Sequence, residues 1–263
     1  MPQLFELQRG TGPILVNVPH AGTHVPAAIA DGLTAPARDL PDTDWYVDEL
    51  YGFAPALEAG LMVATHSRYV VDLNRPPDDS ALYTTRGTGL VPDRSFAGEP
   101  LYQPGRQPDA AEVRRRVEQY WTPYHAALGA ELERLRHSHG YAILLDGHSI
   151  VSRAPLLFEG RLPDLNLGSN SGQSAHGELI RGAMRALASA TGWSLVLDGR
   201  FRGGHITRYY GRPAEGLHAL QLELAQCIYM REAPPRRIRE DMQRLAELLQ
   251  RLVSELAAWE PPR

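Results

Sequence analysis

The most diagnostic stretch of this sequence is Tyr141-Ala142-Ile143-Leu144-Leu145-Asp146-Gly147-His148-Ser149. Its first five residues form a nearly continuous apolar run, as expected for a central strand that is buried on both faces. A histidine follows directly and stands beside a glycine, which lets a ligand approach the backbone. In α/β proteins, strand ends of this kind open onto the crevice where ligands bind.

A second segment repeats this pattern near the start of the chain. The apolar run Ile14-Leu15-Val16-Asn17-Val18 leads into Pro19-His20-Ala21-Gly22. Two imidazoles that meet at neighbouring strand ends, together with an acidic residue, can form a three-ligand metal site with an open fourth position. We therefore predict that His20 and His148 bind a metal ion, the alternative being that each histidine has only a structural role.

The acidic ligand is expected to come from the segment Asp42-Thr43-Asp44, at the mouth of a predicted helix. Asp44 is the better placed carboxylate and Asp42 the second choice, although both could instead cap that helix. Asp146 is two residues before His148 on an extended segment, so their side chains point the same way. Asp146 can therefore orient the imidazole, or else serve as a turn or cap acceptor.

Glu223 is the candidate general base. In the predicted strand 217–224 three leucines alternate with Gln221 and Glu223, so the two polar side chains share one face. An unpaired carboxylate on a buried face would cost several kcal/mol, unless a cation or a metal-bound water satisfied it. A carboxylate beside such a water can take up its proton and pass it on. The alternative is a salt bridge to an arginine.

Apolar periodicity and turn residues outline the remaining elements. Strands are expected at 4–7, 14–18, 61–65, 69–73, 141–145, 193–197 and 217–224, and helices at 45–57, 109–137 with a kink at Pro123, 175–191, and from Pro234-Pro235 to about 259. A polar loop is expected at 163–173. Residues 76–108, rich in Gly, Pro, Asp and Arg, form either a functional lid or a surface insertion. The whole chain, 1–263, is interpreted as one α/β domain.

Composition excludes several classes of protein. The formal charge of −4 gives no reason to expect nucleic acid or an anionic membrane as a partner. No apolar run is long enough to span a bilayer, and the N-terminal residues do not have the pattern of a signal peptide. A cytoplasmic location is therefore expected. Its single cysteine rules out an intrachain disulfide and a cysteine-based zinc knuckle. All 27 basic residues are arginine, which excludes a phosphate-loop lysine and a Schiff-base lysine.

Eight blocks carry a family resemblance through their shared order. They are Val16-Asn17-Val18-Pro19-His20-Ala21-Gly22-Thr23, Thr43-Asp44-Trp45-Tyr46-Val47-Asp48-Glu49-Leu50-Tyr51, Arg68-Tyr69-Val70-Val71-Asp72-Leu73-Asn74-Arg75-Pro76, Gly89-Leu90-Val91-Pro92, Gly98-Glu99-Pro100-Leu101-Tyr102, Leu145-Asp146-Gly147-His148-Ser149, Gly203-Gly204-His205-Ile206-Thr207-Arg208 and Gln221-Leu222-Glu223-Leu224. Along most of its length the chain resembles the N-formylglutamate amidohydrolases.

This resemblance implies a zinc-dependent amide hydrolase with a mixed central sheet flanked by helices, similar to the zinc carboxypeptidases. Such enzymes split N-formyl-L-glutamate into formate and L-glutamate, the last step of one route of histidine degradation. Carried onto this sequence, the metal ligands are His20, Asp44 and His148, and the general base is Glu223. The usual carboxypeptidase motif has a glutamate three residues after its first histidine, where this chain has Thr23.

A substrate with two carboxylates needs cationic partners beside the metal. Arg68 and Arg75, with Asn74, are the first candidates, and Arg208 and Arg212 the second, because a guanidinium binds a carboxylate through two hydrogen bonds. Each arginine could instead be a solvated surface charge. Three functional alternatives stay open: a different divalent metal, another N-acyl amino acid as substrate, or a binding module of the same fold without turnover. The sequence says nothing of oligomeric state.

Overall fold

The sheet has seven strands within the residues that the structure, a computed structural model, describes, namely 3–81 and 88–262. In chain order they are β1 (Phe5–Gln8), β2 (Ile14–Val18), β3 (Gly60–Ala64), β4 (Ala142–Ile150), β5 (Leu165–Gly168), β6 (Leu195–Leu197) and β7 (Leu217–Ala225). Their spatial order is β1-β3-β2-β4-β7-β5-β6. The central strands β3, β2, β4 and β7 are parallel, whereas β1, β5 and β6 run the opposite way. The predicted α/β fold with a mixed sheet is confirmed.

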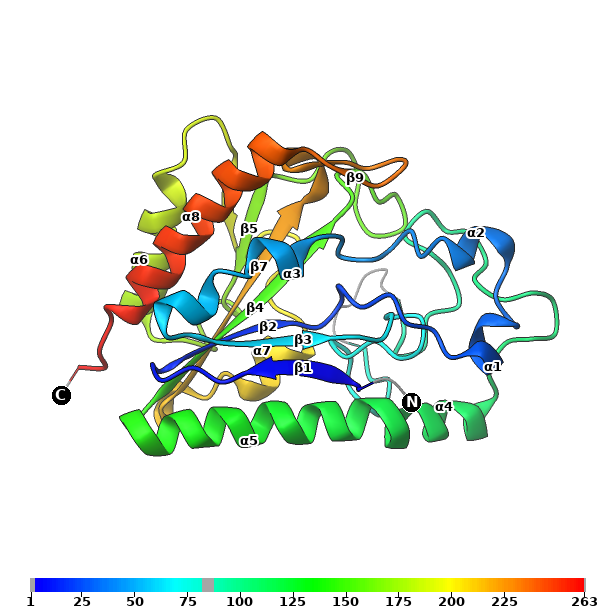
Figure 1. Ribbon diagram of the computed structural model, residues 1–263, viewed down its shortest axis with the longest axis horizontal. Coiled ribbons are helices and arrows are strands. Elements are labelled where there is room, and N and C mark those ends of the chain that lie inside the picture. The colour runs from blue at the N-terminus through cyan, green and yellow to red at the C-terminus, as the bar shows by residue number, and fades with distance from the viewer. Residues whose placement is uncertain (1–2, 82–87, 263) are drawn as a thin grey trace.

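Helices cover both faces of this sheet (Figure 1). They are α1 (Ala27–Ala30), α2 (Ala35–Arg38), α3 (Val47–Leu50), α4 (Ala110–Arg116), α5 (Thr122–His139), α6 (Gly177–Ala188), α7 (His205–Tyr210) and α8 (Arg239–Ala257). Shorter elements are the helical turns η1 (Ala54–Leu57), η2 (Val117–Trp121), η3 (Pro213–Glu215) and η4 (Gln226–Ile228), and the hairpin of β8 (Met230–Arg231) and β9 (Arg236–Arg237).

The alternation of side chains along β4 divides the core into two halves. Ile143 and Leu145 belong to the half that α3, α6 and α8 cover, whereas Ala142 and Leu144 belong to the half under α5 and α7. All four residues are fully buried, which explains why the strand reads as a continuous apolar run. A third, smaller apolar cluster joins α2 to the segment around Tyr102.

The register between β4 and β7 brings polar residues together inside the sheet. His148 is paired with Glu223, and Asp146 with Gln221. The strand therefore extends to Ile150, beyond the predicted end at Leu145. Backbone pairing with β7 continues through Asp146 and His148 because their side chains find polar partners, so His148 lies within its strand and not after it.

One loop prediction and one strand prediction were wrong. The predicted loop at 163–173 contains β5, which pairs antiparallel with β7 and buries Leu165 and Leu167 completely. The predicted strand at 69–73 is instead a turn. The guanidinium of Arg116 in α4 donates to the carbonyl oxygens of Tyr69 and Val70 (3.3 and 3.2 Å), taking the place of a neighbouring strand.

Helix boundaries also differ from the prediction at three places. The helix expected at 45–57 is split into α3 and η1. Gly52 lies between the two elements, and Pro55 lies within η1. The helix expected at 109–137 forms, with Asp109 as its N-cap, but it passes through the π-helical turn η2 just before Pro123. The last helix begins at Arg239, because Pro234 and Pro235 lie in the connection between β8 and β9.

The segment 76–108 contains no helix or strand of the sheet among its described residues, and positions 82–87 lie outside them. Its later part is tied down by backbone hydrogen bonds from Thr34 to Leu101 (2.9 Å) and from Gln103 to Gly32 (2.9 Å). A lid function for this segment stays a prediction. Over the described parts of the chain, no helix combines the length and apolarity needed to cross a bilayer.

Candidate metal centre

Three predicted ligands meet at the carboxyl ends of the central strands. His20 follows β2, His148 lies near the end of β4, and Asp44 precedes α3. One potential ligand atom from each lies within 4.8 Å of the others, and all three side chains are buried. The backbone amide of Asp44 donates to the carbonyl of His20 (3.1 Å), which holds the Asp44 loop against the end of β2.

A carboxylate holds the outer nitrogen of each imidazole. Nε2 of His20 lies 2.9 Å from Oδ1 of Asp72, and Nε2 of His148 lies 2.9 Å from Oδ2 of Asp146. A proton on each Nε2 satisfies these contacts, and Nδ1 of each ring then faces Oδ2 of Asp44, at 3.8 Å for His20 and 3.1 Å for His148. Carboxylate partners of this kind fix the tautomer and orientation of metal-binding histidines.

Sequence reasoning found Asp146 in this role but missed Asp72. The turn that replaces the expected strand at 69–73 brings Asp72 back to His20, 52 residues earlier in the chain. The only sequence signal was one carboxylate within an apolar run, Val70-Val71-Asp72-Leu73.

Asp44, not Asp42, faces the two imidazoles. Its Oδ2 accepts the backbone N–H of Ser149 (3.0 Å), while its Oδ1 is buried with no hydrogen-bond partner. Both oxygens of Asp42 instead accept the backbone N–H of Phe96 (3.1 and 3.0 Å). Neither aspartate caps α3, whose N-cap residue is Tyr46. An orphaned buried carboxylate oxygen beside two oriented Nδ1 atoms fits a cation.

The site also contains the buried guanidinium of Arg68. Its Nη2 contacts Nδ1 of His20 and lies 3.8 Å from Oδ1 of Asp44 and 3.9 Å from Oδ2 of Asp72. Burial opposes the charge of Arg68, but the carboxylates of Asp72 and Asp44 hold its pKa above the ordinary value. The guanidinium carbon of Arg68 lies 4.9 Å from the centroid of the Phe96 ring.

Charges in this cluster move the pKa values of the ligands in opposite directions. Burial, followed by the charge of Arg68, lowers the pKa of His20. Burial also opposes the charge of His148, but Asp146 and Asp44 raise its pKa well above the usual range. For Asp44, burial is outweighed by Arg68 and His148, and the pKa falls. The cluster is thus a buried set of acidic and basic groups whose charges depend on one another.

Glu223 stands beside His148 on the adjacent strand. Burial is the largest cause that raises its pKa, to about 8, partly offset by the charge of His148. Its Oε2 accepts a hydrogen bond from Nε2 of Gln221 (3.2 Å), as expected for two side chains on one face of β7. A carboxyl group with a pKa near neutrality is suited to accepting a proton and returning it.

The remaining predicted substrate-binding residues are Asn74, Arg75, Arg208 and Arg212, and their hydrogen-bond partners show where each one lies. Arg75 donates from Nε to the carbonyl of Thr88 (2.8 Å), and its neighbour Asn74 is buried, with Nδ2 lying 3.1 Å from Nε2 of His148. Arg208 lies in α7, where its Nε donates to the carbonyl of Gly203 (3.0 Å).

Arg212 does not reach the cluster. It bonds to Glu215 (2.8 Å) and forms an isolated bridge with Leu217, the first residue of β7. Six residues of strand, about 20 Å at 3.3 Å per residue, separate Leu217 from Glu223. Arg212 is therefore placed at the opposite end of β7 from the candidate base.

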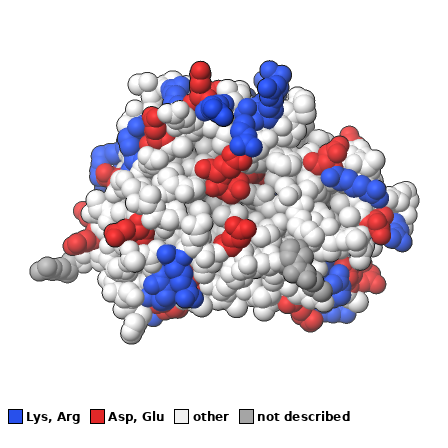
Figure 2. Space-filling model, in the orientation of Figure 1, with Lys and Arg blue, Asp and Glu red and all other residues white. Residues whose placement is uncertain are grey.

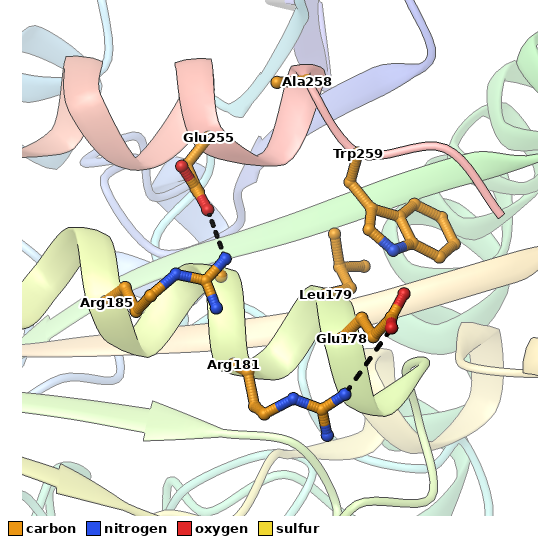
Figure 3. A pocket seen from close by; sticks show the side chains of 8 residues that line it. Glu178, Leu179, Arg181, Arg185, Glu255, Ala258 and Trp259 are labelled. Carbon is orange, nitrogen blue, oxygen red and sulfur yellow. Dashed lines mark hydrogen bonds and ion pairs between the residues drawn. The ribbon is translucent and has the colours of Figure 1, made fainter. Parts of the chain in front are cut away.

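A surface groove of about 310 Å³ lies between α6 and α8, away from these residues (Figure 3). Its arginines are paired with acids, Arg185 with Glu255 (2.8 Å) and Arg181 with Glu178 (3.9 Å). Acidic and basic side chains are interspersed on the face that Figure 2 shows. Neither feature adds chemistry to the buried cluster.

Comparison with known proteins places this geometry in a family. A sequence model of the N-formylglutamate amidohydrolases matches residues 12–230. The chain is 48% identical over 260 residues to the N-formylglutamate deformylase of Pseudomonas aeruginosa, covering 98% of both chains. It is also 48% identical to that of Pseudomonas putida, over 98% of this chain and 97% of the other. The chain belongs to the N-formylglutamate amidohydrolase family.

Solved structures agree with this membership. The N-formylglutamate amidohydrolase of Ralstonia eutropha superimposes with a TM-score of 0.83 at 30% identity, with 97% of each chain covered. A gene product of Agrobacterium tumefaciens shares the fold, with a TM-score of 0.72 at 18% identity over 97% of this chain and 96% of that one. The fold shared with these two structures therefore extends over nearly the whole of this chain.

Proposed function

We propose that this chain hydrolyses N-formyl-L-glutamate to formate and L-glutamate, as the final reaction of a histidine-degradation route. The observation that carries the proposal is near-full-length identity of 48% to N-formylglutamate deformylases, in a chain whose buried histidines, aspartate and glutamate converge at one end of the sheet. The substrate follows from the names of those relatives, and the chemistry follows from the site.

His20, Asp44 and His148 are the residues that would hold the metal. Two imidazole nitrogens and one carboxylate oxygen are a ligand set that suits Zn²⁺ and leaves a fourth position open. The unpartnered Oδ1 of Asp44 and the two Nδ1 atoms fixed by Asp72 and Asp146 fit such an ion. A bound Zn²⁺ would polarise the formyl carbonyl and lower the pKa of a water molecule.

Glu223 transfers the proton in this mechanism. Its carboxylate accepts a proton from the attacking water while the oxygen of that water bonds to the formyl carbon. The protonated carboxyl then gives the proton to the departing amine nitrogen as the C–N bond breaks, so formate and the free amino group of glutamate are released. A pKa of about 8 lies near neutrality, so this carboxyl group can take up a proton in the first step and release it in the second.

The substrate carboxylates need arginine partners near this centre. Arg68 lies inside the cluster and Arg75 lies next to Asn74, so these two are the first candidates, followed by Arg208 on α7. A guanidinium that binds a carboxylate through two hydrogen bonds fixes its orientation as well as its affinity.

Formate release from N-formyl-L-glutamate, with and without a chelator, tests the proposal. We expect turnover that the chelator abolishes and that Zn²⁺ restores. N-acetyl- and N-formimino-glutamate, assayed in parallel, define the acyl group. Undiminished turnover after the metal has been removed and its absence verified would refute the metal-dependent mechanism, and activity on the acetyl compound alone would refute the substrate.

A further inference from the structure

One buried residue, Asn74, contacts a supporting group of each predicted histidine ligand and of the predicted base. Its backbone N–H donates to Oδ1 of Asp72 (2.8 Å), the oxygen that also holds His20. Its side-chain Nδ2 lies 3.4 Å from Oδ2 of Asp146 and 3.4 Å from Oε1 of Gln221. These three partners in turn contact His20, His148 and Glu223. Only 4% of Asn74 is exposed.

The hydrogen-bonding capacity of this amide is used within the protein. Oδ1 accepts the backbone N–H of Ile206 (2.8 Å), which fixes the amide orientation, since only the oxygen can accept there. The two hydrogens on Nδ2 are then matched by the acceptors of Asp146 and Gln221. Nδ2 also lies 3.1 Å from Nε2 of His148, and with a proton on that nitrogen this is a packing contact and not a hydrogen bond.

The backbone of Gly204, at the start of α7, packs closely against the Asn74 amide. A Cβ atom added at Gly204 would lie 2.5 Å from both Nδ2 and Oδ1 of Asn74. The N–H of Gly204 donates to Oε1 of Gln221 (2.8 Å), so that the start of α7 closes over the amide and its partner together.

We propose that Asn74 is a positioning residue, which holds both imidazoles and the general base in register through Asp72, Asp146 and Gln221, and that it is not a substrate contact. This inference rests on the proposed function, because it assigns Asn74 to the support of the metal and the base. It also replaces the expectation from sequence that Asn74 binds a substrate carboxylate. Arg75, with its guanidinium directed to Thr88, stays separate from this network.

Metal affinity of the Asn74→Ala variant provides the first test, with Co²⁺ as the probe. The wild type is measured first, by chelator competition and by the visible absorption of bound Co²⁺. Loss of groups that orient metal ligands typically weakens metal binding about 10- to 100-fold, and we expect that loss in the variant together with an altered Co²⁺ spectrum. A wild type that binds no metal would contradict the proposed function, whereas a wild-type affinity and spectrum in Asn74→Ala would contradict only the inference.

Steady-state kinetics with saturating metal provide the second test. A positioning residue should lower kcat by a similar factor for N-formyl-L-glutamate and for a neutral formamide, with KM little changed. An increase in KM confined to the dicarboxylate, with kcat retained, would show that Asn74 contacts the substrate and would overturn the inference.

Gly204→Ala keeps the test decisive if Asn74→Ala fails to fold. Its methyl group must displace the Asn74 amide without removing it, so it should reproduce the weaker Co²⁺ binding and the lower kcat. The matched control is Gly129→Ala in α5, whose added Cβ would meet only Tyr210 at 3.6 Å, an ordinary contact. Gly129→Ala should bind Co²⁺ as the wild type does, and a folded Gly204→Ala protein that matched it in metal affinity and kcat would overturn the inference.

Discussion

Glu223 and His148 occupy paired positions on neighbouring strands, so the candidate base stands beside a candidate ligand without being one. Asp44, by contrast, belongs to a loop and reaches the same point through its bond to the Ser149 backbone. We therefore expect substitutions at Glu223 and at the candidate ligands to affect proton transfer and metal binding separately.

Glu223→Gln should retain the metal and lose most of its turnover. Glutamine has the same shape and keeps the contact with Gln221, but it cannot accept a proton from water. General-base catalysis contributes about 10²- to 10⁴-fold, so kcat should fall within that range while metal content by elemental analysis stays at one ion per chain. The same substitution at the exposed residue Glu215 is the control. A kcat near that of the wild type would exclude Glu223 as the base.

Asp72→Ala should weaken metal binding through His20. Without the carboxylate, the ring of His20 can rotate or place its proton on Nδ1, and either change removes a ligand. We expect a loss of about 10- to 100-fold in Zn²⁺ affinity, measured by chelator competition. Asp39→Ala, at an exposed position, should have no effect. If both variants kept the wild-type affinity, the orientation of His20 would not depend on Asp72.

His20, His148 and Glu223 could be proposed as site residues from the sequence because each follows or interrupts a clear apolar pattern. Asp44 could be proposed because it stands at the mouth of a predicted helix. Of the supporting residues, Asp146 could be found from its spacing to His148, whereas Asp72 and the role of Asn74 could not. Asp72 lies in a turn whose apolar residues led to the prediction of a strand. The partners of the Asn74 amide, Asp146 and Gln221, lie 72 and 147 residues later in the chain. Local periodicity carries no information about contacts at such separations.

Strands and helices show the same division between local pattern and long-range contact. The strand β2 was predicted with its observed bounds, and β7 within one residue of its end, since burial on one or both faces leaves a regular pattern. The four-residue strand β5 was missed because its pairing with β7 determines it, and neighbouring Gly and Ser residues suggested a loop. The split of the helix at 45–57 was indicated by Gly52 and Pro55, which the apolar periodicity obscured.

Central and edge strands should contribute unequally to stability. Leu145 in β4 is completely buried, whereas Leu197 in the edge strand β6 is 39% exposed. Leu145→Ala should lower the free energy of unfolding by about 2–5 kcal/mol through lost burial and a cavity. Leu197→Ala should lower it by less than about 1 kcal/mol, because that side chain is already partly solvated. Urea denaturation of both variants measures the difference, and equal losses would contradict the central position of β4.

The stability of the whole molecule should depend on pH through histidines outside the metal cluster. His125 links α5 to the segment before Asn74, with Nε2 lying 2.8 Å from the carbonyl oxygen of Leu73. Burial lowers its pKa to about 3. The unfolded chain takes up a proton near pH 6.5 and the folded chain does not, so stability is present above pH 6.5 and is lost as the pH falls toward 3.

His125→Gln should reduce this loss. Between pH 6.5 and pH 5 the wild type should lose about 2 kcal/mol through His125 alone, as unfolding by urea at each pH would show. The variant should be less stable at pH 7 but should have a shallower slope over this interval. His137→Gln, at an exposed site on the same helix, is the control and should keep the slope of the wild type. A slope in His125→Gln equal to that of the wild type would exclude His125 as a source of acid sensitivity.

The end of the sheet opposite the candidate metal centre offers a place to attach a tag. After α8, the carbonyl of Trp259 accepts a hydrogen bond from the Tyr141 hydroxyl (2.9 Å), and the indole of Trp259 packs against His218 near the start of β7. The five residues from His218 to Glu223, about 16 Å of strand at 3.3 Å per residue, separate this anchor from the candidate base. An affinity tag or a fluorescent protein fused after Trp259 would therefore lie at the opposite end of β7 from Glu223, and a chain tethered to a support by this tail would keep the candidate site away from the support.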